Sequence, residues 1–286
     1  MLTVPIITWV SKGEDYLVTC RIGGEKPQSL DTHVRGSFSF ADAYDGGYLN
    51  HTYPNTVMDF SGAVARADVP VVSHETGQFQ VYPDYREIAK YTGVLYPYNM
   101  EVFRDRLARA GVSEQAEDFF LASGRWAAEL YKADIEMDLR TEGLAGFQLL
   151  DLQDYPGQGS AYVGILDAFM DSKGLVSPER WRGFCNEVVP LLLTEKFCWT
   201  EGETLMARVK VAHYAARSLQ GTGLAWTLRD EQGHVIGKGI CPIVSSGRGL
   251  LEVGDIRQPI PVTGKARRLN LELATGYSND LKVGSC

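Results

Sequence analysis

Hydrophobic residues follow two different patterns along this 286-residue chain, and the pattern changes near residue 200. Before that point, short apolar runs alternate with longer stretches in which apolar residues recur every three to four positions. The clearest apolar runs are residues 69–75 and 145–154, with further candidates at 33–42 and, more weakly, 15–21. Such runs are typical of strands that are buried on both faces of a parallel sheet.

Helical patterns separate these strand candidates. They cover residues 54–67, 99–111, 113–140 and 177–193, and Ser113 is expected to be the N-cap of the third. The alternation of strands with helices predicts βαβ units and a parallel sheet. A closed (β/α)8 barrel needs eight strands in about 250 residues, which is more than these candidates supply. The pattern therefore predicts either a smaller open α/β sheet or part of a barrel.

Beyond residue 200, apolar and polar residues alternate with a period of two. Residues 204–214 and 267–275 alternate in this way, and residues 223–239 have the pattern of a hairpin with a polar turn. Short alternating strands with turns between them predict an antiparallel, immunoglobulin-like β-sandwich. The last residues, 281–286, do not continue the alternation, so we expect no sandwich strand there.

Charge and composition exclude several classes of function. The net charge is −8 and the chain has no dense Lys/Arg cluster, which argues against a nucleic-acid or anionic-membrane partner. No apolar run approaches the roughly 18 residues of a membrane-spanning helix. The five cysteines are scattered and lack CxxC spacing, so we expect free thiols and neither a metal site nor a cofactor.

Two predicted strands end in side chains that can carry chemistry. His74 and Glu75 follow one apolar run, and Asp151, Gln153 and Asp154 follow another. Ligands of parallel α/β proteins bind at the carboxyl ends of the strands, so both stretches lie where a site is expected.

Glu75 has two interpretations. It is either a solvated or capping carboxylate of a loop, or a catalytic carboxylate. Gln78 belongs to a group of amide and aromatic side chains of the kind that hydrogen-bond and stack on sugars; the others are Phe79, Gln80 and Tyr82. His74 is expected to orient or pack rather than to bind a metal.

Asp151 and Asp154 also have two interpretations. Each either holds the loop through hydrogen bonds to the backbone or, together with Gln153, contacts the hydroxyl groups of a carbohydrate. The sequence alone leaves both open.

Five stretches of the chain together resemble glycoside hydrolase family 2, specifically its β-galactosidase-like members. In chain order these are residues 34–48, 70–85, 91–111, 122–141 and 146–174. The resemblance extends from about residue 15 to about residue 280. It implies a retaining exo-glycosidase, which uses two carboxylates about 5 Å apart, one as nucleophile and one as acid/base.

The resemblance implies that Glu75 is the nucleophile at the end of the seventh barrel strand and that residues 145–154 contain the eighth. The acid/base of the family follows an Asn, and no Asn-Glu pair precedes Glu75; the pair Asn186-Glu187 falls in a predicted helix. We therefore expect the C-terminal part of a (β/α)8 barrel at residues 1–196 and the sandwich at residues 197–286.

Such a chain is expected to be inactive alone and to associate with itself or with the missing part of the enzyme, because an incomplete barrel exposes sheet edges. The alternative is a non-catalytic carbohydrate-binding or assembly module. The sequence indicates no compartment, although members of the family are often periplasmic or secreted.

Overall fold

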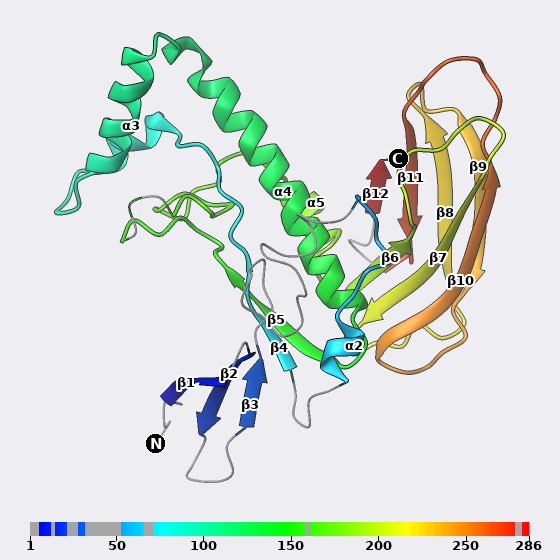
Figure 1. Cartoon of the computed structure of the whole chain (residues 1–286). Helices are drawn as coiled ribbons and strands as arrows, with labels where there is room; N and C mark the ends of the chain where they lie inside the picture. The colour runs from blue at the N-terminus through cyan, green and yellow to red at the C-terminus, as the bar shows by residue number, and fades with distance from the viewer. Residues whose placement is uncertain are drawn as a thin grey trace.

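The computed structural model describes residues 53–65, 71–157, 159 and 161–277, together with the backbone of strands at 6–12, 15–21, 28–31 and 282–285. The side chains of Ala63, His74 and Glu75 lie outside this description. Figure 1 shows a long helix, α4 (Ala116–Arg140), that extends from the side of α3 (Tyr98–Arg109) to the base of a β-sandwich.

The sandwich consists of two antiparallel sheets (Figure 1). The first has the order β10–β7–β6, with bounds Gly249–Pro259, Thr204–His213 and Val188–Leu193. The second has the order β12–β11–β8–β9, with bounds Lys282–Ser285, Leu269–Ala274, Gly223–Asp230 and Val235–Pro242. The predicted strands and the hairpin are therefore confirmed.

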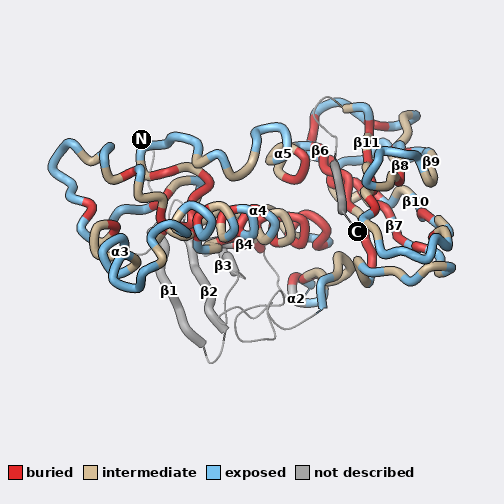
Figure 2. Tube along the Cα trace, turned by 90° about the horizontal axis from the view of Figure 1, so that it is seen from above, coloured by how far each residue is buried: buried red, intermediate tan, exposed pale blue. Residues whose placement is uncertain are grey.

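Alternate residues of the two sheets form one hydrophobic core, as the period of two requires. The first sheet contributes Leu205, Ala207, Val209 and Val211 to this core, and the second contributes Leu224, Leu228, Leu269, Leu271 and Leu273. Met206, between two of the buried positions, is half exposed. Figure 2 shows the buried positions running through the sandwich and along α4.

Two predictions about the sandwich were wrong. The stretch predicted as a helix over 177–193 contains only a short helix, α5 (Pro178–Arg182), and then strand β6. Pro190 cannot continue a helix, but it is tolerated in β6 because that strand lies at the edge of its sheet. Residues 282–285, where no strand was expected, pair with β11 as β12.

β6 joins the sandwich to the helical part. One of its faces belongs to the sandwich core through Val188, and the other packs on α4, where Val189 and Leu191 meet Ile135 and Leu139. A strand with both faces covered explains the unbroken apolar run from which the helix was predicted.

The parallel part of the structure is a pair of strands, β4 (Val71–Gly77) and β5 (Leu144–Leu150), which confirms two of the strand candidates. Within the described residues no other strand extends this pair, and the strands do not close into a barrel. Residues 15–21 form β2 (Asp15–Arg21), which pairs antiparallel with β1 (Ile6–Lys12) and β3 (Gln28–Asp31). The candidate at 33–42 lies outside the described residues.

The predicted helices differ at their ends. Within residues 53–65, the described part of the helix expected over 54–67, only α2 (Ser61–Val64) is helical. The Asn55 side chain accepts hydrogen bonds from the amides of Val57 and Met58 and closes a turn instead. Ser113 begins a 3-10 turn, η2 (Ser113–Gln115), rather than capping α4 directly. A second 3-10 helix, η1 (Tyr85–Lys90), follows β4.

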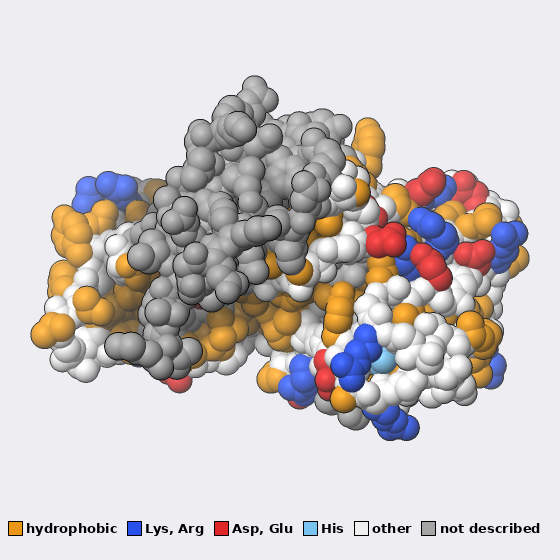
Figure 3. Space-filling view, turned by 90° about the horizontal axis from the view of Figure 1, so that it is seen from below, with side chains coloured by type: hydrophobic (Ala, Val, Ile, Leu, Met, Phe, Trp, Pro, Cys, Tyr) orange, Lys and Arg blue, Asp and Glu red, His pale blue; other side chains and the backbone are white. Residues whose placement is uncertain are grey.

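Charges of both signs are interspersed over the sandwich on the face shown in Figure 3. None of the described helices is long and apolar enough to cross a membrane. The described cysteines, Cys185, Cys198 and Cys241, are free thiols, as predicted.

Candidate functional site

The two polar strand ends lie next to each other. β4 and β5 run parallel from Val71 beside Leu144 to Gly77 beside Leu150, so the residues that follow them, Gln78 and Asp151, leave the same edge. Gly77 and Gln78 both have positive φ, +103° and +64°, which turns the chain sharply at the end of β4. Two stretches far apart in sequence are thus brought together at a strand-end edge.

The backbone of β4 carries a β-bulge at the predicted nucleophile. Ser73 lies beside Phe147 and Thr76 beside Leu149, so two residues of β4, His74 and Glu75, stand opposite one residue of β5. Bulges of this kind bend a strand and redirect its side chains, and they are common next to active sites.

Buried carboxylates of α4 hold strand β4 at the residues that follow the bulge. The Ser73 and Thr76 hydroxyls are 2.6 Å apart, and the Thr76 hydroxyl donates to Asp138 Oδ2 at 3.1 Å. The backbone amide of Gly77 donates to Asp134 Oδ2 at 2.9 Å. All four side chains are buried, and burial, together with the nearby Asp134, raises the pKa of Asp138 well above its ordinary value.

Sequence reasoning missed Asp134 and Asp138. Their spacing of four residues places them on one face of the helix. One signal in the sequence could have found them. The next residues in the chain, Ile135 and Leu139, are apolar, which is typical of a helix end that is buried on all faces.

Asp151 and Gln153 are half-buried after β5. Asp151 Oδ1 accepts a hydrogen bond from the Leu152 amide at 2.7 Å, so one oxygen holds the loop, in line with the structural alternative. Beneath them, the hydroxyl of the fully buried Tyr131 donates to the carbonyl oxygens of Val163 (2.6 Å) and Asp151 (3.2 Å). Tyr131 thereby holds the loop at the end of β5 in place.

Asp154 is the most constrained of the predicted site residues. It is buried, it accepts a hydrogen bond from the Gly164 amide at 2.9 Å, and both of its oxygens lie 2.7 Å from Lys173 Nζ, which is also buried. Burial raises the pKa of Asp154, and the Lys173 ammonium group and the Gly164 amide oppose that rise. These contacts are those of a residue that holds its loop, although a contact with sugar stays a prediction.

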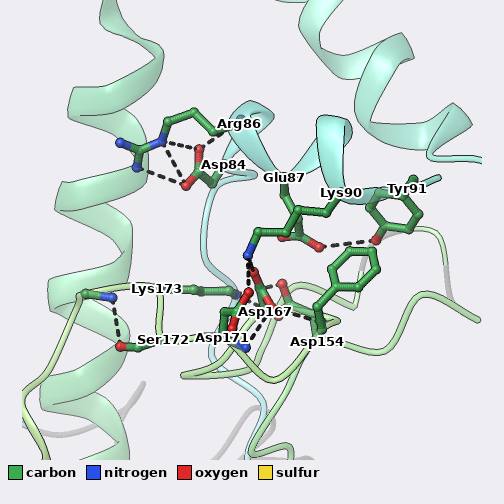
Figure 4. A network of polar contacts seen from close by, with 12 residues as sticks. Asp84, Arg86, Glu87, Lys90, Tyr91, Asp154, Asp167, Asp171, Ser172 and Lys173 are labelled. Atoms are coloured by element: carbon green, nitrogen blue, oxygen red, sulfur yellow. Dashed lines mark hydrogen bonds and ion pairs between the residues drawn. The ribbon is translucent and has the colours of Figure 1, made fainter.

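Figure 4 shows how this loop is tied to η1. Lys90 Nζ contacts Asp167 and lies 2.7 Å from Asp171 Oδ2, and the Tyr91 hydroxyl donates to Glu87 Oε1 at 3.2 Å. Glu87 is buried, and burial, with the charges of Asp154 and Asp167 nearby, raises its pKa.

A small cavity of about 40 Å³ lies beside Asp154. It is lined by aromatic and amide side chains, among them Tyr91, Tyr96, Asn99, Tyr155 and Tyr162.

The remaining sequence candidates lie as follows. Gln78 is half-buried; the side chains of His74 and Glu75 lie outside the described residues, although their backbone forms the bulge. The alternative pair Asn186-Glu187 precedes β6, and Glu187 Oε1 accepts a hydrogen bond from the Tyr277 hydroxyl of the sandwich at 2.7 Å. Among the described residues, no group of three or more His, Cys, Asp or Glu side chains is placed to hold a metal ion.

A larger pocket, of about 510 Å³, lies on the sandwich. Its lining includes Phe197, Trp199, Pro261, Lys265 and Arg267. Hydrogen bonds from the hydroxyl and amide of Thr263 and from the amide of Gly264 lower the pKa of Glu201, at its rim, to about 2. Trp199 Nε1 and Arg267 Nη2 are buried donors without an acceptor among the described residues.

Comparison with known proteins gives a partial match. A family model described as a domain of unknown function (DUF8488) matches residues 203–283, which is most of the sandwich. No curated protein matches the sequence.

Three of the similar solved structures are glycosidases. A β-D-mannosidase from Dictyoglomus thermophilum is 14% identical and has a TM-score of 0.45, with 79% of this chain and 28% of that chain covered. A β-glucuronidase from glycoside hydrolase family 2 is 13% identical, with a TM-score of 0.23 over 76% of this chain and 20% of that chain. A β-glucuronidase 2 from Bacteroides uniformis is 12% identical, with a TM-score of 0.20 over 79% and 26%.

The chain thus spans 20% to 28% of the length of these solved structures. At these TM-scores the likeness does not define the fold, which rests on the strand pairing described above.

Proposed function

We propose that this chain carries the C-terminal strands of a (β/α)8 barrel and the nucleophile, Glu75, of a β-galactosidase-like retaining exo-glycosidase. The observation that carries the proposal is the parallel pairing of β4 and β5, in which the bulge at Glu75 lies opposite the residue between Phe147 and Leu149, shortly before the polar end of β5. The five stretches that resemble glycoside hydrolase family 2 support the same assignment.

In this reaction the Glu75 carboxylate attacks the anomeric carbon of the sugar. A bond from the carboxylate oxygen to that carbon forms while the bond from the carbon to the leaving oxygen breaks, and the electron pair departs with the leaving group. Water then releases the sugar from the enzyme. His74, Gln78, Asp151, and Gln153 are proposed to bind hydroxyl groups or to orient Glu75, and Asp154 acts mainly through the loop that it holds.

The leaving oxygen needs a proton, and no Asn-Glu pair precedes Glu75 in this chain. General acid catalysis contributes about 10²–10⁴-fold, so we expect the isolated chain to be inactive or nearly so. A partner that supplies further barrel strands would dock against the outer edges of β4 and β5, to which no other described strand is hydrogen-bonded. Gel filtration tests this proposal, and a clean monomer would count against self-association.

The experiment compares the purified chain with Glu75→Gln. The purified chain should give no clear turnover of nitrophenyl β-galactosides, β-glucosides, β-mannosides or β-glucuronides. Clear turnover would contradict the claim that this chain lacks the acid/base. Dinitrophenyl deoxyfluoro-glycosides of the same sugars have a leaving group that needs no proton. One of them should form a covalent adduct with the parent chain and none with Glu75→Gln.

A non-catalytic carbohydrate-binding role is the second candidate, and the sandwich pocket favours it. A volume of about 510 Å³ is in the range of small-ligand sites, and the lining combines aromatic walls with unsatisfied N–H donors. Calorimetry with oligosaccharides distinguishes the candidates. Binding that persists in Glu75→Gln, is lost in Arg267→Met, and accompanies no adduct on the parent chain would favour binding over catalysis.

A further inference from the structure

The bulge in β4 creates a problem of backbone pairing. An extra residue in a strand interrupts the regular ladder, and buried N–H groups that lose their ladder partners need others. In this structure the amide of Gly77, the second residue after the bulge, is paired with a side chain, Asp134 Oδ2, at 2.9 Å. The helix therefore contributes to the hydrogen bonding of the strand next to the bulge.

The contacts flank Glu75 on both sides. Ser73 precedes the bulge, Thr76 and Gly77 follow it, and the hydroxyls of Ser73 and Thr76 meet across it at 2.6 Å. Thr76 then donates to Asp138 Oδ2 at 3.1 Å. The two carboxylates come from successive turns of α4, so one rigid helix fixes both contact points of the strand.

Burial makes these contacts costly to break. Ser73, Thr76, Asp134 and Asp138 are each at most 4% exposed. A buried polar group that loses its partner costs about 1–3 kcal/mol, and more if it is charged. Moving the strand away from α4 at Thr76 or Gly77 therefore carries an energetic cost of this size.

We infer that Asp134 and Asp138 are positioning residues that clamp the bulge of β4 and so hold the backbone that carries Glu75. This inference rests on the proposed function, because it assigns the clamp to the nucleophile of that reaction. The clamp acts through Thr76 and the Gly77 amide and does not touch the substrate.

The test removes one hydroxyl. Thr76→Val deletes the hydroxyl that contacts Ser73 and donates to Asp138, while it keeps the shape of the side chain and the hydrogen bond between Ser73 and Asp138. Thr141→Val is the matched control, because Thr141 is equally buried at the end of α4 and its hydroxyl contacts Met137 and Phe60 instead of β4. Asp134→Ala and Asp134→Asn form a second pair, in which the asparagine oxygen can still accept from the Gly77 amide.

The first readout is the rate at which a dinitrophenyl deoxyfluoro-glycoside labels Glu75, measured with the unfolding temperature of each variant. Misplacing a reacting group by about 1 Å can cost 10²-fold. Thr76→Val and Asp134→Ala should label about 10–100-fold more slowly than the parent, while Thr141→Val and Asp134→Asn stay within a few-fold. Equal slowing of Thr76→Val and Thr141→Val, or unchanged labelling of Thr76→Val, would overturn the clamp.

The second readout is amide hydrogen exchange at Thr76 and Gly77, which requires no reaction. Exchange there should accelerate in Thr76→Val and Asp134→Ala but not in Thr141→Val, and unchanged exchange would overturn the clamp. If the parent chain is never labelled but exchange behaves as expected, the proposed function fails while the clamp on the strand stands. The two failures are therefore separate.

Discussion

The buried ion pair between Asp154 and Lys173 offers a direct test of how the loop after β5 is built. Their side chains are only 3% and 4% exposed, and Lys173 Nζ lies 2.7 Å from Asp154 Oδ2. The same ammonium group donates to the Gly164 carbonyl at 3.0 Å, and the Gly164 amide donates back to Asp154. Removing either partner leaves the other charge buried without its counterion.

The expected cost follows from this burial. Breaking a buried ion pair by removing one partner typically costs about 3–5 kcal/mol, whereas replacing both partners by apolar residues is often nearly neutral. Lys173→Met and Asp154→Leu should each lose about 3–5 kcal/mol of unfolding free energy. The double variant should lose much less than the sum of the two.

Urea unfolding followed by circular dichroism measures these differences. With a urea m-value of about 2–3 kcal/mol/M, each single substitution should lower the midpoint by about 1–2.5 M. Glu179→Gln, which breaks the exposed pair with Arg182, is the control and should change stability by less than about 1 kcal/mol. Losses below about 1 kcal/mol in both single variants would refute the structural role of Asp154 and return it to the candidates for sugar binding.

Three further predictions concern residues that are described in full. Burial raises the pKa of Asp138, so the folded state binds the proton of this carboxyl group more tightly than the unfolded state. Stability should therefore fall as pH rises above the ordinary Asp pKa of about 4, and Asp138→Asn should lessen that fall. Thermal unfolding between about pH 4 and pH 8 measures this, and the same pH dependence of the unfolding temperature in both proteins would contradict it. Leu228→Ala in the sandwich core should lower the unfolding free energy by about 2–5 kcal/mol in chemical denaturation. Met206→Ala, at a half-exposed position, should lower it by less than about 0.5 kcal/mol. Equal losses would contradict the alternation of buried and exposed residues along the strands. Gly77→Ala should lower the unfolding temperature by several degrees, because its Cβ would lie 2.1 Å from Tyr131 Cε1 at a φ of +103°. An unchanged unfolding temperature would contradict the close packing of Gly77 against Tyr131.

The sandwich could be predicted from sequence because its signal is local. Leu205, Ala207, Val209 and Val211 alternate with polar residues, and one buried face of a strand is enough to produce that pattern. β6 could not be predicted in the same way. Its two faces are covered by different parts of the molecule, so Val188 and Val189 are both buried and no alternation remains.

The two neighbouring strand ends were predictable from the sequence, but the contacts around them were not. The apolar runs before Glu75 and Asp151 indicated two neighbouring strand ends, and the parallel pairing of β4 with β5 agrees. The bulge, the contacts of Asp134 and Asp138, and the ion pair of Asp154 depend on partners 19 to 62 residues away. Such contacts have no periodic signal in the sequence.

The central claim is that Glu75 is a nucleophile, and the most direct measurement is the site of covalent labelling. The parent chain is incubated with the dinitrophenyl deoxyfluoro-glycosides, digested, and the modified peptide is sequenced by mass spectrometry. We predict a single added sugar on Glu75 and none in Glu75→Gln. An adduct on another carboxylate, or no adduct with any of the sugars, would contradict the assignment.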